Sequence, residues 1–147
     1  MAGTTERAGW LLKRAQDVLN TAMTAALHGL GATVPEYAVL TALADEPGMS
    51  NADLARRAYV TPQTMNQVLR ELERRDWVSR HPHPEHGRIL QAELTGEGGR
   101  VLAACHRAVG AVEERMLAGL GPAERGQLVA ALQSCIAGLS TGSINPG

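Results

Sequence analysis

The sequence Thr61–Arg75, TPQTMNQVLRELERR, decides the fold of this 147-residue chain. Thr61 can cap the start of a helix with its hydroxyl, and Pro62 suits the first helical position, where an amide hydrogen has no partner. Apolar residues then recur at intervals of three and four, which places them on one helix face that must be buried. These residues are Met65, Val68, Leu69 and Leu72.

The opposite face of this predicted helix is polar. It carries amide, hydroxyl and guanidinium groups, which suit a helix that lies in a DNA major groove. Because every surface helix is amphipathic, this face alone is equally compatible with ordinary solvent exposure. The residues predicted to contact DNA from this face are Gln63, Thr64, Asn66, Gln67, Arg70 and Arg74.

A second short helix precedes the first. The segment Ser50–Asp53, SNAD, is a capping box, which predicts a helix over Asn51–Ala58. Tyr59–Val60 leaves only a tight turn before Thr61, so the two helices form a helix-turn-helix. The two capping residues, Ser50 and Thr61, are also candidates for DNA contact.

A β-hairpin is expected directly after the helix-turn-helix. Trp77–His81 is a strand candidate, and His81–Gly87, HPHPEHG, is predicted to be a loop because it holds two prolines and a glycine. Ile89–Leu94 alternates between two faces, as a half-buried strand does. Such a hairpin forms a wing, and Arg88 near its tip is a candidate for contact with the minor groove or the DNA backbone.

Long apolar helices flank this unit. Stripes at helical spacing, Gly breaks and a capping box at Thr33–Glu36 predict helices over 10–30, 33–45 and 99–118 and another from Pro122. Their surplus apolar surface implies a second copy of the chain, and a symmetric dimer matches a pseudo-palindromic operator in double-stranded DNA. The predicted fold is therefore a mainly α winged helix-turn-helix with a small β-hairpin wing. Its parts are a DNA-binding lobe at 33–94, dimerisation helices at 8–31 and 99–139, and a disordered tail at 140–147.

The charge is distributed unevenly. The whole chain has a formal net charge of −1, but residues 56–88 hold seven arginines and four acids, a net +3. This fits a regulator whose reading surface is locally basic. The N-terminus lacks the pattern of a signal peptide and no apolar run is long enough to span a membrane, so we expect a cytoplasmic protein. Cys105 and Cys135 lie in apolar helical patterns, which predicts two buried thiols.

The order of these elements resembles the MarR family of bacterial transcriptional regulators. The resemblance is sharpest in residues 49–80, at Asp53–Ala55, Val60–Thr61, Val68–Leu72 and Trp77–Val78. It implies an obligate dimer joined by the terminal helices, which represses nearby genes until a small aromatic or otherwise apolar ligand binds. The residues that would line the ligand pocket are Trp10, Met23, His28, Tyr37, Leu40 and Met65.

One departure from the family pattern lies in the wing. Where the family often has an Asp two residues before an Arg, this chain has His86 before Arg88, so the usual carboxylate anchor of the arginine is a histidine. His81, His83 and His86 leave open a metal-responsive regulator of the same fold, although no Cys or paired carboxylate completes a site.

Other classes of protein remain as alternatives. A redox-responsive regulator would need a reactive cysteine, and a winged protein-interaction module would leave the polar face of Gln63–Arg70 unexplained. A small helical enzyme or carrier has little support, because the sequence has no P-loop, GxSxG, GxGxxG or HExxH motif. We therefore predict no catalytic residue, no resident metal and no cofactor.

Overall fold

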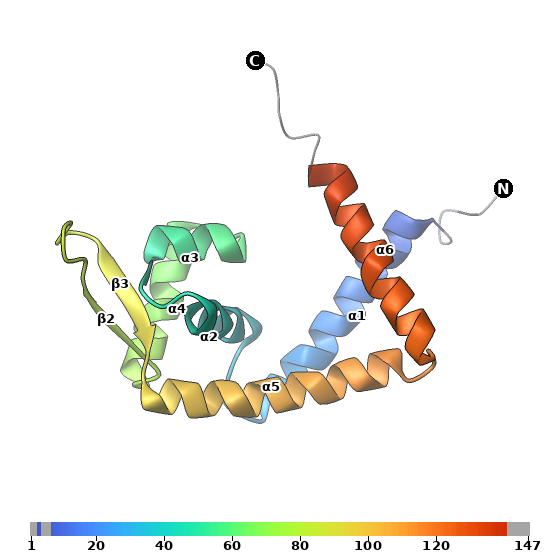
Figure 1. Cartoon of the computed structure of the whole chain (residues 1–147). Helices are drawn as coiled ribbons and strands as arrows, with labels where there is room; N and C mark the ends of the chain where they lie inside the picture. Colours follow the sequence, from blue (N-terminus) through green and yellow to red (C-terminus); the bar gives the residue numbers. More distant parts are fainter. Residues whose placement is uncertain (1–2, 4–6, 141–147) are drawn as a thin grey trace, which may run out of the picture. The chain divides into compact units, whose positions relative to one another are not determined.

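Helices dominate the part of the chain that the computed structural model describes, residues 3 and 7–140 (Figure 1). The chain divides into two compact units, one up to Val112 and one from Glu113, so the boundary falls inside a helix. The elements in chain order are α1 (Ala8–His28), α2 (Val34–Asp45), β1 (Met49–Ser50), α3 (Asn51–Ala58), α4 (Pro62–Arg74), β2 (Val78–Pro82), β3 (Leu90–Leu94), α5 (Gly96–Leu117) and α6 (Pro122–Ser140).

Side-chain caps begin α2, α3 and α4, as the sequence predicts. Thr33 and Ser50 each form a full capping box, with Glu36 and Asp53 respectively, and Thr61 caps α4 through its hydroxyl. α5 begins at Gly96, three residues earlier than predicted. The reason is that the Thr95 hydroxyl accepts a hydrogen bond from the Gly98 amide at 3.0 Å and so caps the helix.

The wing has three strands, where the sequence predicted two. All pairs are antiparallel in the order β1-β3-β2, and Met49 pairs with Ala92. β1 has only two residues, too few for an alternating pattern to reveal it. β2 also extends through Pro82, which was predicted to lie in a loop. Since β2 is an edge strand, the missing amide hydrogen of Pro82 costs no ladder bond.

One hydrophobic core holds the first unit together. Apolar residues of three elements meet there: Leu54 of α3, Leu69 of α4 and Ala92 of β3 are all buried. α1 contributes Leu27 in its last turn, and α5 contributes Cys105. This core fixes α3 and α4 relative to the sheet, and Figure 1 shows these helices beside the β2–β3 hairpin.

The second unit comprises the end of α5 and α6. An ion pair joins Arg125 of α6 to Glu114 of α5 at 3.2 Å, and the Arg125 Nε also donates to the Leu120 carbonyl. No described residue of α6 is buried. Cys135 is therefore exposed in the single chain, contrary to the prediction of two buried thiols. Ser140, the first residue of the predicted tail, closes α6, and residues 141–147 lie outside the described residues.

Candidate nucleic-acid interface

The orientation of α4 is set by its buried stripe. Met65, Leu69 and Leu72 are almost completely buried, so the other side of the helix must face outward. At its start, the Thr61 Oγ1 accepts from the Thr64 amide at 3.1 Å, and Asn51 of α3 donates from its side chain to the Pro62 carbonyl at 3.1 Å. These contacts hold the beginnings of α3 and α4 together.

The outward face of α4 carries the residues predicted to contact DNA. Gln63, Thr64, Gln67 and Arg70 are exposed, and the structure gives Gln63, Gln67 and Arg70 no side-chain partner within the described chain. Long amide and guanidinium groups with free hydrogen-bonding atoms can pair with adenine and guanine edges. The structure therefore brings these four residues together on one accessible surface, which we call the α4 face.

Asn66 belongs to the same helix but is held differently. Its Oδ1 accepts from Arg80 of β2 at 3.3 Å, and the Arg80 Nε donates to Glu73 at 2.5 Å. Arg80 therefore orients the side-chain amide of Asn66 from the wing side. The NH₂ group of Asn66 is not used in this contact. Sequence reasoning did not assign this role to Arg80, because the pairing joins residues of two different elements.

Arg74, also predicted to contact DNA, is already paired. It donates two hydrogen bonds to Glu71, at 2.9 and 2.6 Å, and Arg75 donates a third at 3.0 Å. The pKa of Glu71 is consequently lowered to about 2, by Arg74 first and Arg75 second. A contact between Arg74 and a phosphate would have to replace this ion pair.

Arg75 connects the end of α4 to α2, to the turn between α1 and α2, and to Trp77 just before β2. It donates to Glu36 of α2 at 2.9 Å and to the Gly31 carbonyl between α1 and α2. Its guanidinium also lies over the Trp77 ring, 4.3 Å from the centroid. Glu36 is the buried charged residue of this core, and Arg75 neutralises it. No local pattern predicts this junction, since Arg75 and Gly31 are 44 positions apart.

The wing presents Arg88 without an anchor. Arg88 is exposed, and within residues 7–140 no hydrogen bond or ion pair reaches its side chain, including any from His86. The ring of His83, in contrast, accepts at Nδ1 from the backbone amides of Glu85 at 3.0 Å and His86 at 3.2 Å. The proposed support of Arg88 by His86 is therefore absent from this arrangement, and His83 shapes the loop instead.

His81 of the wing and Ser50, the capping residue of α3, also have partners within the chain. His81 lies 3.7 Å from Glu93 across the β2–β3 ladder, and the Ser50 Oγ accepts from the Asp53 amide at 3.1 Å. Ser50 is half-buried, so its hydroxyl serves α3 before any DNA contact. In the described part of the chain, no group of three or more His, Cys, Asp or Glu side chains is arranged to hold a metal ion.

The six predicted pocket residues do not form one site within a protomer. Leu40 and Met65 are core residues, and Tyr37 packs against that core while its hydroxyl lies 2.8 Å from Nδ1 of His106 on α5. His28 ends α1, whereas Trp10 lies in its first turn, about 27 Å away along the axis. Trp10 instead borders a shallow surface hollow with Lys13, Arg14 and Asp17. Met23 is half-buried on α1.

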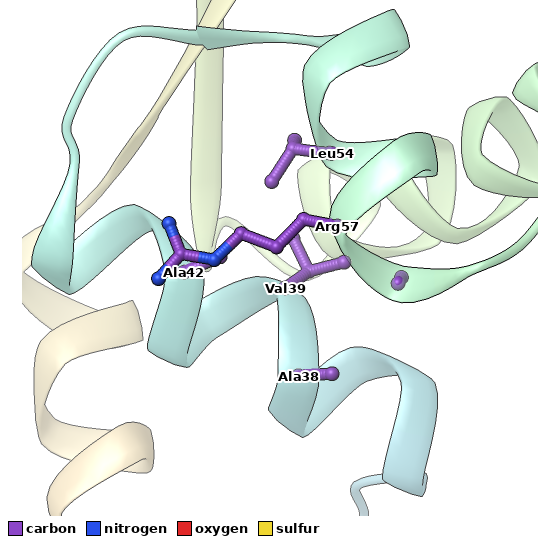
Figure 2. Close-up of a pocket in the computed structure, with 6 residues that line it drawn as sticks. Ala38, Val39, Ala42, Leu54 and Arg57 are labelled. Carbon is purple, nitrogen blue, oxygen red and sulfur yellow. The ribbon is translucent and has the colours of Figure 1, made fainter. Parts of the chain in front are cut away.

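A small cavity between α2 and α3 does not serve as a ligand pocket. Its volume is about 30 Å³, and Ala38, Val39, Ala42, Leu54, Arg57 and Ala58 line it. Figure 2 shows Arg57 reaching across from α3 towards Ala42, where its guanidinium pairs with Asp45 at 3.2 Å. A drug-sized ligand needs about ten times this volume.

Comparison with known proteins assigns the family. A sequence model described as MarR family matches residues 28–89. The HTH-type transcriptional repressor Rv2887 of Mycobacterium tuberculosis is 45% identical over 112 residues, which cover 76% of this chain and 81% of that protein. The chain belongs to the MarR family. As a member, it is a DNA-binding transcriptional regulator, and the predicted winged helix-turn-helix fold is confirmed.

Solved structures of MarR-family proteins agree with this fold. The complex of Rv2887 with DNA superposes with a TM-score of 0.77 at 37% identity, covering 88% of this chain and 97% of that one. The complex of Rv2887 with salicylic acid gives a TM-score of 0.74 at 40% identity, covering 88% and 96%. Within the described residues, no helix of this MarR-family chain is long and apolar enough to cross a membrane.

Proposed function

We propose that this MarR-family protein is a homodimeric repressor that reads a pseudo-palindromic operator through α4 and leaves it when a small aromatic acid binds. The observation that carries the proposal is the α4 face: Gln63, Gln67 and Arg70 project from a helix whose other side is locked into the core. The proposal gives the chain no catalytic activity and places it in the cytoplasm, with the DNA that it regulates.

The polar residues fall into three groups in this proposal, which contact base edges, the groove edge, and the DNA backbone or minor groove. Gln67 and Arg70 read base edges, and Asn66 does so through the NH₂ group that Arg80 leaves available. Thr61, Gln63, Thr64 and Ser50 contact the groove edge near the helix starts. Arg74 contacts a phosphate after exchanging with Glu71, and Arg88 enters the minor groove or meets the backbone.

The proposed dimer is supported by the apolar surface of the terminal helices. In the single chain, α6 leaves Val129, Ile136 and Leu139 exposed, and α1 leaves Leu11 and Val18 exposed. Such a surface is typical of a protein that buries it against a second copy. We therefore assign residues 33–94 to the DNA-binding lobe and 8–31 and 99–139 to the dimer.

The choice of effector is supported by the relative that binds salicylic acid. On this chain, we place the aromatic acid near the end of α1 and on Tyr37, where Met23 offers apolar contact and His28 and the Tyr37 hydroxyl offer polar ends. Leu40 and Met65 belong to the buried core against which Tyr37 packs. Trp10 lies too far along α1 to join them in the same protomer.

Arg75 offers a route from this region to the DNA-reading helix. It bonds both to the Gly31 carbonyl, just after α1, and to Glu36 of α2, and it belongs to the end of α4. A ligand that displaces the turn between α1 and α2 would therefore tilt α4. The ligand can release DNA only to the extent that it prefers the tilted arrangement.

Binding to the DNA upstream of the protein's own gene tests the reading role. We expect Arg70→Ala to weaken binding to that fragment by about 1–3 kcal/mol and to leave binding to random duplex nearly unchanged, because the lost pair is to a base. Arg107→Ala, an exposed arginine of α5, is the matched control and should preserve both affinities. Equal losses on the two DNAs would contradict base reading by Arg70.

Titration with salicylate tests the regulatory half. Fluorescence anisotropy of the labelled upstream fragment should fall as salicylate is added, while thermal melting of the free protein rises. If salicylate raised the melting temperature without releasing DNA, the coupling through Arg75 would be wrong. If it did neither, the effector would belong to a different chemical class.

A further inference from the structure

Tyr59 adopts a backbone conformation that its side chain does not favour. It ends α3 with φ 56° and ψ 40°, in the left-handed region. Among the described residues that are not glycine, only Asp76 shares a positive φ, at 59°. Asp tolerates this region because its short side chain can bond locally, whereas a bulky aromatic gains nothing there. Glycine would serve the same turn with less strain.

The side chain of Tyr59 does not compensate for this strain within the protein. It is 95% exposed, more than any other large hydrophobic residue of the described chain. Within residues 7–140, no hydrogen bond or ring contact involves its phenol group. Neither the core nor the turn therefore explains a tyrosine at this position. A strained and exposed residue of this kind points to a role outside the folded chain.

The position of Tyr59 points to DNA as the partner. It lies in the turn between α3 and α4, two residues before the Thr61 cap and four before Gln63, where the α4 face begins. In a helix-turn-helix, the start of the second helix meets base edges while the first helix crosses the backbone. The joining turn consequently runs beside the phosphates at the edge of the groove, and a tyrosine hydroxyl is a common donor to phosphate.

We propose that Tyr59 donates its phenol hydroxyl to a backbone phosphate of the operator and that the chain retains the strained tyrosine for this contact. The inference rests on the proposed function, since it requires DNA on the α4 face. The contact is neutral on the protein side. It should therefore add affinity without releasing a further counterion, unlike a contact made by an arginine.

Replacing Tyr59 should change thermal stability and DNA affinity in opposite directions. Tyr59→Gly should raise the melting temperature by about 2–4 °C, because glycine relieves the left-handed strain. The same variant should weaken binding to both the upstream fragment and random duplex by about tenfold, because a phosphate contact carries no sequence information. Tyr59→Phe, which removes only the hydroxyl, should show the same loss of affinity.

Two control variants of the full-length protein separate this contact from other effects. Asp76→Gly changes the other left-handed residue, at the far end of α4, and should keep DNA affinity unchanged. Arg88→Ala should lower the slope of log affinity against log salt by about one phosphate equivalent, whereas Tyr59→Phe should leave that slope as in the wild type.

The outcomes distinguish this inference from the function on which it rests. If the wild type binds and Tyr59→Phe binds equally well, the phosphate contact is refuted while the repressor proposal stands. A fall in melting temperature for Tyr59→Gly would refute the argument from strain. If the wild type binds neither the upstream fragment nor random duplex, both proposals fail together.

Discussion

α4 and α6 both carry apolar side chains at helical spacing, but they differ in what covers those side chains. In α4, Leu69 and Leu72 are completely buried by neighbouring elements of the same protomer. In α6, Ile136 is 66% exposed and Leu139 is 84% exposed. Because a helix gains most of its stability from burying its apolar face, the two helices must be stabilised in different ways. The apolar residues of α4 are covered within one chain, whereas those of α6 are left exposed in the single chain.

Truncating the buried stripe of α4 should have the largest effect. We expect Leu69→Ala to destabilise the folded protein by about 2–5 kcal/mol, because it leaves a cavity in a fully packed core. Urea unfolding followed by circular dichroism measures this change. Val129→Ala on α6 is the matched control and should cost far less at protein concentrations where the chain is monomeric. Similar losses of unfolding free energy for the two variants would contradict this difference between α4 and α6.

Placing a charge on the exposed stripe of α6 should act on assembly alone. Ile136→Glu should weaken the dimer by about 2–3 kcal/mol, because a carboxylate would have to be buried in the interface. Sedimentation equilibrium should show that the Ile136→Glu variant is monomeric. Ser134→Glu, on the opposite side of α6 by helical spacing, should leave the dimer intact. A wild type that is already monomeric at the protein concentrations of this experiment would contradict the prediction.

The junction between the lobe and α5 should be sensitive to a single methyl group. A Cβ at Gly98 would collide with the backbone carbonyl of Trp77, whereas a Cβ at Gly99 would meet open space. Gly98→Ala should therefore destabilise the protein by about 1–3 kcal/mol, as overpacking does, while Gly99→Ala should stabilise it by up to about 1 kcal/mol. Thermal unfolding of the two variants checks the contrast, and equal melting temperatures would contradict the close approach.

Lowering the pH should destabilise the protein at the end of α4, by less than the substitutions described above. The pKa of Glu71 in the folded state is about 2, below its ordinary value of 4.5, because Arg74 and Arg75 donate to it. Its contribution to stability is therefore complete above about pH 4.5 and is lost as the pH falls towards 2. Glu71→Gln should flatten this part of the stability profile measured by denaturant unfolding. A profile identical to the wild type would show that the ion pairs contribute nothing in solution.

The sequence alone was enough to predict where α2, α3 and α4 begin and which face of α4 is buried. The caps at Thr33, Ser50 and Thr61 and the stripe from Met65 to Leu72 are local signals, because a helix start depends on three neighbouring residues and a buried face repeats every three or four. For the same reason, the outward residues of α4 could be named as candidates for DNA contact before any coordinates. Their contact with DNA itself stays a prediction.

Only the tertiary structure decided how these pieces are joined. The bonds from Arg75 to Gly31 and Glu36, the hold of Arg80 on Asn66, and the pairing of β1 with β3 all connect distant positions. No local pattern encodes such contacts, since they arise from packing of complete elements. The left-handed backbone of Tyr59 is likewise invisible in a sequence whose propensities argue against it, because the closing turn of α3 overrides the preference of the residue.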